Sequence, residues 1–230
     1  MKADGAGRFL VLEGIEGTGK STQGRRLAAR LRERGIEVVE TREPGGTGVG
    51  ERIRSLVLHA PDLDIPSEAE LFLILAARSA FVRQVVNPAL ARGAWVLSDR
   101  FDLSTFAYQG YGRGIDLDTV ATLNEVATGG RAPDLTLVLD VDPEESQARQ
   151  SAEGDAPDRI EAEGSSFLAR VRQGYVDLVG RRPEAVLISG VGSVEEVENR
   201  VWTAVVSGFP QELRTPEGLR GPETIGGSAV

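Results

Sequence analysis

Residues 14–21 read GIEGTGKS, which has the G-x-x-x-x-G-K-S spacing of a loop that binds phosphate groups. The loop directly follows an apolar run at 9–12 and directly precedes a helical pattern at 21–34. A strand, a glycine-rich turn and a helix start point several backbone N–H groups at one place, where the helix dipole adds positive charge. In such a loop Lys20 reaches the outer phosphates and the Ser21 hydroxyl can bind Mg²⁺. The spacing and its context therefore predict a nucleotide polyphosphate site rather than a chance glycine-rich turn.

The composition limits the classes of function. The chain of 230 residues suits one domain and carries 26 basic against 35 acidic side chains, a net charge of −9. This charge argues against a general nucleic-acid or membrane-surface binder, so a phosphate site has to be a local basic region. The chain has no cysteine, which excludes disulfides and a cysteine nucleophile. There is no signal-like N-terminus and no apolar run near the ~18 residues of a membrane span, so we expect a cytoplasmic protein without membrane or nucleic-acid partners.

Short apolar runs alternate with helical patterns along the chain. Strand-like runs separated by segments of helical length imply a parallel sheet covered by helices. The predicted strands are residues 8–13, 37–41, 94–98, 134–141 and 185–189. The predicted helices are residues 21–34, 51–58, 67–86, 117–127, 161–179 and 194–206, with one more that opens at Pro143.

Local signals refine this outline. Ser67, with Glu70 three residues later, predicts a capping box at a helix start, and Pro88 predicts the end of that helix or a kink in it. Residues 150–157 are small, polar and acidic, which is typical of a mobile loop. From residue 208 onward prolines and glycines replace periodicity, which predicts a disordered tail.

Asp99 and Arg100 follow the third predicted strand, at the sheet edge where ligands of open α/β sheets collect. Asp99 could hold Mg²⁺ directly or through water, and Arg100 could bind a phosphate through two hydrogen bonds; a structural ion pair is the alternative. Arg78 follows the apolar segment 71–77, so we expect it near a buried face with a partner for its charge. Other arginines could converge above the sheet or lie on solvated helix faces: Arg42, Arg54 and Arg113.

Residues 104–114, STFAYQGYGRG, combine side chains that can read the edge of a base with aromatic rings that can pack on a sugar or a base. A polar loop with structural tyrosines is an equally good interpretation of the composition.

The order of these motifs resembles that of the bacterial thymidylate kinases, from about residue 8 to about residue 206. The resemblance implies transfer of the γ-phosphoryl group of ATP to dTMP with Mg²⁺, usually by a homodimer. It also implies an α/β protein of the P-loop NTPase fold, with a five-stranded parallel sheet covered by helices on both faces. The domain would span 1–207, with a lid at about 149–160, before a tail at 208–230. The motifs are GIEGTGKS at 14–21, TREPGGT at 41–47, AAR at 76–78, SDRF at 98–101, STFAYQGYGRG at 104–114, PDLTLVLDV at 133–141 and DRIE at 158–161.

The resemblance assigns roles to single residues. It places Glu16 at the sugar 3′-hydroxyl, Arg54 and Arg100 at the dTMP phosphate, Arg78 at the thymine edge and Tyr108 against the deoxyribose. The residues implied for ATP are Gly14, Ile15, Glu16, Gly17, Thr18, Gly19, Lys20, Ser21 and Thr22. Those implied for dTMP are Glu16, Arg54, Ile74, Arg78, Arg100, Thr105, Tyr108 and Gln109, and those for Mg²⁺ are Ser21 and Asp99. The residues expected to act on the transferred group are Lys20, Arg100, Arg149 and Arg159.

Two positions depart from the family pattern. Ile74 stands where relatives commonly have a phenylalanine that stacks on thymine, and Phe72 lies two residues away, on the opposite side of a helix. Gly17 stands where some relatives have a catalytic arginine, so we expect the lid to supply the cation through Arg149 and Arg159.

Other functions remain compatible with these motifs. A deoxynucleoside kinase would need a base to activate a neutral hydroxyl, and a pair of phosphate-binding arginines would be superfluous there. A nucleotide-dependent switch or scaffold is a second alternative, although the chain has no N-K-x-D motif for guanine. His59, the single histidine, is expected to be structural or exposed.

Overall fold

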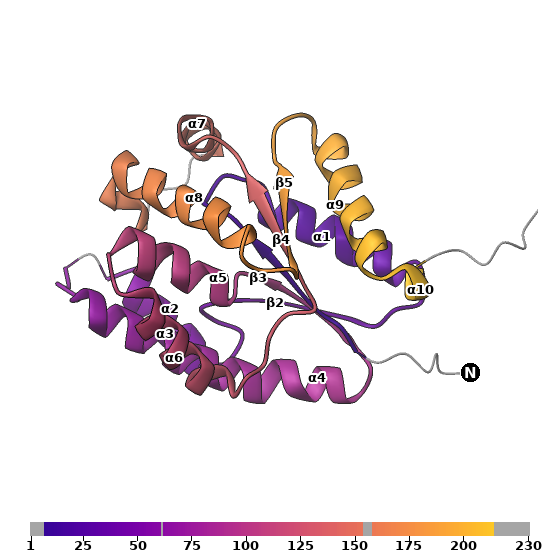
Figure 1. Cartoon of the computed structure of the whole chain (residues 1–230), viewed down its shortest axis with the longest axis horizontal. Coiled ribbons are helices and arrows are strands. Elements are labelled where there is room, and N and C mark those ends of the chain that lie inside the picture. Colours follow the sequence, from indigo (N-terminus) through magenta and orange to yellow (C-terminus); the bar gives the residue numbers. More distant parts are fainter. Residues whose placement is uncertain (1–6, 61, 154–157, 214–230) are drawn as a thin grey trace, which may run out of the picture.

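The computed structural model describes residues 7–60, 62–153 and 158–213. Within them, five strands form one parallel sheet in the order β2-β3-β1-β4-β5 (Figure 1). This confirms the predicted parallel sheet. The strands are β1 (Phe9–Glu13), β2 (Val38–Arg42), β3 (Trp95–Asp99), β4 (Leu135–Asp140) and β5 (Ala185–Ser189).

Helices cover both faces of the sheet, as predicted (Figure 1). α1 and α9 lie on one face, and α3, α4 and α8 lie on the other. The helices are α1 (Lys20–Arg32), α2 (Gly48–Leu58), α3 (Ser67–Phe81), α4 (Asn87–Ala91), α5 (Asp102–Thr105), α6 (Leu117–Thr128), α7 (Pro143–Glu153), α8 (Ser165–Val179), α9 (Val194–Gly208) and α10 (Pro210–Leu213). Two π-helical segments, η1 (Val82–Val86) and η2 (Phe106–Gly112), and one 3₁₀ turn, η3 (Glu161–Glu163), complete them. Within the part of the chain that is described, no helix has the length and apolar character of a membrane span.

The central strand β1 shows why the first apolar run has no polar alternation. Leu10 and Leu12 pack against α1 and α9, while Phe9 and Val11 pack against the helices of the other face. All four side chains are buried, as expected of a strand with helices on both sides.

The order in which the chain adds strands to the sheet reverses between β1 and β3, and the carboxyl ends of these two strands lie at that point. From β1 the chain passes through α1 to β2, and from β3 it returns past β1 to β4. Ligands of open α/β sheets bind in the crevice at such a reversal. The loop at 14–21 and the Asp99-Arg100 pair both lie there.

The helix predicted at 67–86 differs in two respects. Ser67 makes no capping hydrogen bond, and Glu70 is fully buried, so the predicted capping box is wrong. The Glu70 carboxylate is drawn inward because buried donors from elsewhere in the chain bind it. The predicted helix end at Pro88 is also wrong, because the chain stays helical past it; Pro88 lies in the first turn of α4, directly after the wide π-helical turn η1. A π-helical turn is one way for a helix to accommodate the missing N–H and the ring of a proline.

Two further segments differ from the sequence outline. Residues 104–114 are largely helical, in α5 and η2, rather than a polar loop. Residues 150–153 extend α7 instead of forming a loop, because no glycine or proline interrupts the chain before 154, and residues 154–157 of the predicted lid lie outside the described residues.

The tail prediction is wrong for residues 208–213. They finish α9 and form α10, and the side chains of Phe209 and Leu213 are buried. Phe209 packs edge-on against Trp95 with ring centroids 5.0 Å apart, so the apolar residues here outweigh the proline and glycine signal. Residues 214–230 of the predicted tail lie outside the described residues.

Candidate active site

The loop predicted from GIEGTGKS connects β1 to α1, and close contacts require glycine at two of its positions. Gly14 and Gly17 have φ values of 134° and 72°, which side-chain-bearing residues rarely adopt. A Cβ atom on Gly14 would lie 2.4 Å from the Leu139 carbonyl oxygen, and one on Gly17 would lie 2.5 Å from the Ser146 carbonyl oxygen. The backbone therefore leaves no space for an arginine at position 17, which accounts for that departure from the family pattern.

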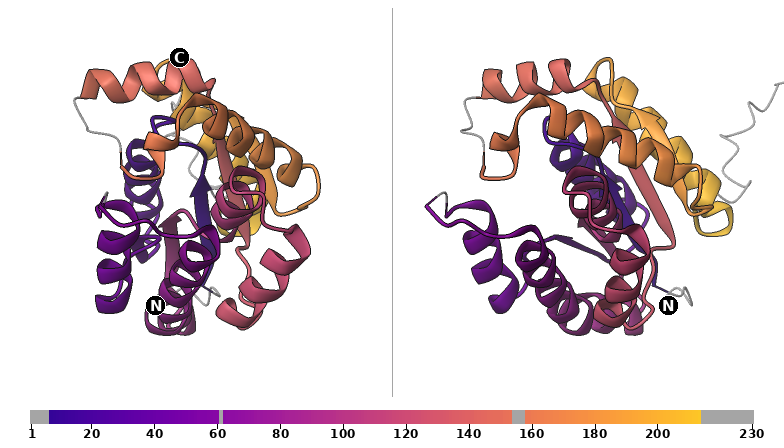
Figure 2. Two further views of the ribbon diagram at one scale, coloured as in Figure 1. Left: turned by 90° about the vertical axis from the view of Figure 1, so that its left-hand side faces the viewer. Right: turned by 60° about the vertical axis from the view of Figure 1, so that its left-hand side comes forward.

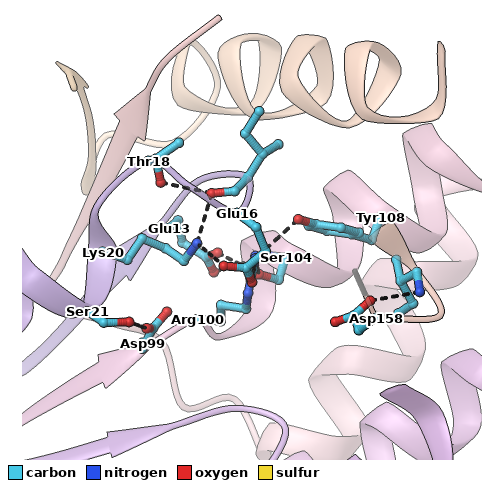
Figure 3. A network of polar contacts seen from close by, with 12 residues as sticks. Glu13, Glu16, Thr18, Lys20, Ser21, Asp99, Arg100, Ser104, Tyr108 and Asp158 are labelled. Atoms are coloured by element: carbon cyan, nitrogen blue, oxygen red, sulfur yellow. Dashed lines mark hydrogen bonds and ion pairs between the residues drawn. The ribbon is translucent and has the colours of Figure 1, made fainter. Parts of the chain in front are cut away.

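Two side chains of the loop stabilise it through hydrogen bonds to its own backbone (Figure 3). Lys20 Nζ donates to the Ile15 carbonyl oxygen at 2.9 Å and to Glu16 Oε2 at 3.3 Å, and the Thr18 hydroxyl donates to the same carbonyl at 2.8 Å. The loop and the start of α1 line one pocket through seven of the nine residues predicted for ATP: Glu16, Gly17, Thr18, Gly19, Lys20, Ser21 and Thr22. Gly14 and Ile15 are not in its lining and shape the loop from behind.

Ser21 and Asp99 meet across the crevice. The Ser21 hydroxyl donates to Asp99 Oδ2 at 3.1 Å (Figure 3). A hydroxyl and a carboxylate oxygen at this distance fit Mg²⁺, which takes oxygen ligands and usually only one or two of them from protein carboxylates. No group of three or more acidic, histidine or cysteine side chains suited to a metal occurs in the described part of the chain, so substrate phosphates and water would have to complete the shell.

Arg100 links the loop to the second half of the site. Its backbone has a φ of 73°, an unusual conformation for a residue other than glycine. Its Nη2 donates to Glu16 Oε1 at 2.6 Å and to the Tyr108 hydroxyl at 3.2 Å, and its guanidinium lies 5.0 Å from the centre of the Tyr108 ring. Burial opposes charge on Glu16, but Lys20 and Arg100 outweigh it and hold the pKa of Glu16 well below its ordinary value.

Glu13, which the sequence analysis did not select, holds this turn in place. Its carboxylate accepts from the backbone N–H of Phe101 at 2.9 Å, the Ser104 hydroxyl at 2.6 Å and the Tyr175 hydroxyl at 2.8 Å. Burial raises the pKa of Glu13 in spite of the nearby Arg100. An acidic residue at the end of an otherwise apolar strand, directly before the loop, was the signal that could have found it.

A second pocket adjoins the first and contains every residue predicted for dTMP. Its lining comes from the loop, α2, α3, α5, η2 and three segments outside them: the turn after β2, the turn after β3 and the residues just before η3. Figure 2 shows α2 and α3 on one side of the molecule and α7 and α8 on another. Glu16, Arg54 and Asp158 line both pockets, so the two cavities meet at these side chains. The eight predicted residues in the second pocket are Glu16, Arg54, Ile74, Arg78, Arg100, Thr105, Tyr108 and Gln109.

Arg78 has the charge partner that the sequence predicted. Its Nε donates to Glu43 Oε2 at 2.8 Å, and its Nη1 donates to the Thr105 hydroxyl at 2.7 Å and to Asn124 Oδ1 at 2.9 Å. Its Nη2 donates to the Phe101 carbonyl oxygen at 2.8 Å. Because a guanidinium has five N–H donors, one is left for a ligand, and the other four hold the pocket wall together.

Arg54 is the least neutralised cation of the site. It donates to the Pro44 carbonyl oxygen at 3.1 Å and has no carboxylate ion pair within the described residues. Burial, together with Arg42 and Arg100, lowers the pKa of Arg54. Positive charge that is concentrated and not neutralised in this way favours an anionic ligand between Arg54 and Arg100.

The other arginines of the predicted set are engaged elsewhere. Arg42 pairs with Glu51 at 3.0 Å, and both its side chain and that of Glu51 are largely exposed. Arg113 pairs with Glu70 at 3.1 Å, so neither arginine joins the two pockets.

The two lid arginines have different positions. Arg149, on α7, lines the loop pocket and donates to the Gly190 carbonyl oxygen at 3.1 and 3.2 Å and to Glu145 at 2.6 Å. Arg159 donates to the Val57 carbonyl oxygen at 2.7 Å and contacts Glu70, and it is absent from the lining of both pockets. The structure thus brings Arg149 to the loop and does not bring Arg159 there.

At the wall that would face a base, Ile74 occupies the position where relatives commonly have a phenylalanine, as expected. Ile74 lines the second pocket, whereas the Phe72 side chain is 58% exposed and lies outside it. The pocket therefore presents an aliphatic surface where the family pattern has an aromatic ring. His59 is exposed, as predicted.

The arrangement suits a reaction between two anions. One pocket has backbone amides and a lysine, the other has unneutralised guanidinium charge, and the residues at their junction are shared. His59 lines the loop pocket, and no histidine lines the second pocket, where the acceptor would bind. The second pocket therefore neutralises and positions charge rather than supplying an imidazole base.

Comparisons with known proteins agree with this geometry. A family model described as thymidylate kinase matches residues 12–201. The thymidylate kinase of Pseudomonas putida (strain GB-1) is 47% identical over 210 residues, which cover 91% of this chain and 99% of the relative. That of Synechococcus sp. (strain RCC307) is 48% identical over 213 residues, or 90% of this chain and 99% of the relative. The crystal structure of thymidylate kinase from Ehrlichia chaffeensis superposes with a TM-score of 0.72 at 33% identity and covers 87% of this chain and 99% of that one.

Proposed function

The chain belongs to the thymidylate kinase family, and from this premise we propose that its two joined pockets hold ATP and dTMP for direct phosphoryl transfer. The enzyme catalyses ATP + dTMP → ADP + dTDP, a step of nucleotide biosynthesis. The observation that carries the assignment of pockets is that Glu16 and Arg54 line both of them, so the ends of two bound nucleotides would meet there.

ATP binds with its phosphates on the loop. The backbone amides of residues 16–22 and the positive end of α1 face that pocket, and Lys20 Nζ exchanges its present partners for the outer phosphate oxygens. Ser21 and Asp99 would hold Mg²⁺, which would neutralise charge on the phosphate oxygens.

The dTMP phosphate lies between Arg54 and Arg100. Arg54 is free of a carboxylate partner within the described residues, and Arg100 is preset by its bonds to Glu16 and Tyr108. A phosphate oxygen of dTMP is already anionic, so the acceptor needs no general base. The protein lowers the barrier by holding two repelling anions in line and spreading cations around them.

The nucleoside part of dTMP occupies the remainder of the second pocket. Tyr108 packs against the deoxyribose, and Ile74 presses on one face of the thymine ring. The remaining N–H of Arg78 faces the edge of the base, along with side chains from η2 and the end of α5. The contacts with thymine are assigned to Ile74, Arg78, Thr105 and Gln109, and the contact with the 3′-hydroxyl is assigned to Glu16.

Arg149 and Arg159 add positive charge around the transferred phosphoryl group when the lid closes. Arg149 already lies beside the loop, and its carbonyl partner Gly190 is uncharged, so a phosphate oxygen can replace that bond. Arg159 has to release Glu70 before it reaches the transferred group. This requirement would couple its catalytic position to the binding of substrate.

We also propose that the enzyme acts in the cytoplasm as a homodimer. Phe72 on α3 and Val126 on α6 are 58% and 77% exposed, and these helices pack side by side (Figure 1). Exposed apolar side chains on two helices that pack together are a feature of interfaces. Sedimentation at micromolar concentration should give twice the mass of one chain, and Phe72→Asp should reduce it to one.

The test of the assigned reaction is ADP release with each nucleoside monophosphate in turn and with thymidine. We expect dTMP to stimulate turnover and thymidine to leave it at the background rate, because Arg54 and Arg100 require an anionic acceptor. Equal stimulation by thymidine would favour a deoxynucleoside kinase, and stimulation by no acceptor would favour a nucleotide-dependent switch.

A further inference from the structure

We propose that Glu70 is a positioning residue that sets which atom of Gln109 faces the base and thereby makes the pocket select thymine over cytosine. The inference rests on the proposed function, because it deepens the contact assigned there to Gln109. It starts from a buried carboxylate that lies outside the lining of both pockets and to which no contact with a substrate has been assigned.

Glu70 lies on α3, one helical turn before Ile74, and its side chain is 1% exposed. Its Oε1 accepts from Gln109 Nε2 at 2.8 Å and from Arg113 Nε at 3.3 Å. Its Oε2 accepts from Arg113 Nη2 at 3.1 Å and from Arg159 Nη2. A carboxylate offers about four lone-pair sites, so these four donors saturate it.

The carboxylate is ionised at neutral pH. Burial alone would raise the pKa of Glu70, but the hydrogen bonds from Arg113, Gln109 and Arg159 outweigh it and hold the pKa below its ordinary value. An ionised carboxylate can only accept hydrogen bonds. Glu70 therefore dictates that its neighbour presents a donor.

This one-way requirement fixes the side-chain amide of Gln109. In the opposite orientation Gln109 Oε1 would face a carboxylate oxygen, and two acceptors would meet in a buried place. Nε2 consequently points to Glu70, and Oε1 is the atom left for the pocket that Gln109 lines. No hydrogen bond within the described residues engages Oε1.

An acceptor at this position distinguishes the two pyrimidines. Thymine has a ring N3–H donor, which Oε1 can accept, whereas the N3 atom of cytosine is itself an acceptor. Cytosine would leave two buried acceptors facing each other, and a site built around a hydrogen bond rejects an analogue that cannot make it. Uracil has the same N3–H as thymine, so this device does not select against it.

The experiment compares kcat/KM for dTMP, dUMP and dCMP in the full chain. Glu70→Gln places an amide opposite Gln109 that can donate as well as accept. The Gln109 amide can then flip by 180° and present Nε2 instead of Oε1 to the base. We expect the dTMP:dCMP ratio to fall by about tenfold or more and the dTMP:dUMP ratio to stay unchanged. Glu163→Gln is the matched control, because Glu163 also binds Arg113 but does not touch Gln109. It should keep both wild-type ratios.

A second measurement does not depend on the folding of that variant. In the wild-type protein without ligand, the Gln109 side-chain amide should give an NMR signal protected from solvent exchange, identified by its absence in Gln109→Met. Rapid exchange of this amide would overturn the inference, as would an unchanged dTMP:dCMP ratio in Glu70→Gln or an equal loss in Glu163→Gln.

The results separate this inference from the function on which it rests. A wild-type protein that does not phosphorylate dTMP would remove both. Loss of pyrimidine discrimination in Gln109→Met, with normal discrimination in Glu70→Gln, would remove only the positioning role of Glu70.

Discussion

Arg100 Nη2 donates to Glu16 Oε1 at 2.6 Å, and this bond joins the turn after β3 to the phosphate-binding loop after β1 (Figure 3). The two residues are 84 positions apart in the chain. The bond places the Arg100 guanidinium at the junction of the two pockets. The backbone of Arg100 has an unusual conformation, and Glu13 stabilises it by accepting a hydrogen bond from the next backbone N–H, that of Phe101. A residue held this way is preorganised for the anion that it binds.

Replacing Arg100 tests this preorganisation. We expect Arg100→Ala to lower kcat/KM for dTMP about 100-fold or more, because a positioned cation is lost from the place where charge is transferred. Steady-state kinetics measure the effect. Arg92→Ala is the control, because Arg92 pairs with Glu37 on the surface. Near-wild-type turnover in Arg100→Ala would contradict the role.

The pairing of Ser21 with Asp99 predicts the metal dependence. Asp99→Asn should raise the Mg²⁺ concentration for half-maximal activity about tenfold, since an amide oxygen attracts a divalent cation less than a carboxylate does. Activity is followed across a Mg²⁺ titration. Asp140→Asn serves as the comparison, because Asp140 also ends a strand but binds Arg172 at 2.7 Å. A similar shift in both variants would argue against a metal role for Asp99.

Arg159 tests whether the lid supplies a catalytic cation. We expect Arg159→Ala to lower kcat about 1,000-fold with a smaller change in KM for dTMP, as for other arginines that stabilise a transferred phosphoryl group. Arg113→Ala removes another guanidinium from Glu70 and controls for the loss of that anchor. Normal kcat in Arg159→Ala would refute the catalytic role.

Glu43 predicts a pH dependence of stability. Burial outweighs the neighbouring Arg78 and raises the pKa of Glu43 to about 7, and Glu43 Oε1 has no hydrogen-bond partner within the described residues. Because the folded state holds this proton more tightly than the unfolded state, the contribution is complete below the ordinary glutamate pKa and is lost as pH rises towards 7.

Urea unfolding at pH 5 and pH 7.5 measures this contribution. The free energy of unfolding of the wild type should fall with pH more steeply than that of Glu43→Gln, with a difference on the order of 2 kcal/mol. Titrating groups distant from Glu43 are common to both proteins and cancel, whereas the carboxylates of Glu13 and Asp102 repel that of Glu43, so the difference between the two proteins includes their coupling to it. Parallel pH profiles would show that Glu43 does not titrate in this range.

Phe209 tests whether the segment after α9 belongs to the folded domain. The ring is 5% exposed and packs against Trp95, so Phe209→Ala should lower the free energy of unfolding by about 3–5 kcal/mol. Leu63→Ala, at a side chain 42% exposed, should cost much less. Equal thermal midpoints for the two variants would place Phe209 outside the cooperative core.

The sequence was most informative where a signal was local. The glycine-lysine-serine spacing located the loop, and the apolar runs located all five strands, because backbone geometry and burial impose short-range patterns. Even Phe72 was placed correctly on the far side of its helix, since residues two apart cannot share a helical face. The eight residues assigned to dTMP by resemblance line one pocket, although their contacts with a ligand remain predictions.

The errors arose where a distant partner outweighed a local signal. Glu70 lay in the position of a capping box, but Gln109 and Arg113 bind its carboxylate in the interior. Residues 208–213 contain a glycine and a proline that suggested a tail, yet Trp95 offers Phe209 a buried surface. Glu43 and Tyr175 escaped notice because nothing near them in the sequence shows what they touch.

By itself, the sequence determined the class of site: a phosphate-binding loop on a parallel sheet, with arginines and without a cysteine, in an acidic chain. Only the tertiary structure decided which of the arginines can bind an anionic ligand and which are already neutralised by a carboxylate. Arg54 lacks a carboxylate partner within the described residues, whereas Arg78 and Arg113 are bound to buried glutamates from other segments. The reason is physical: a motif depends on bonds between near neighbours, whereas the charge that a ligand meets depends on every group that folding brings within a few ångströms.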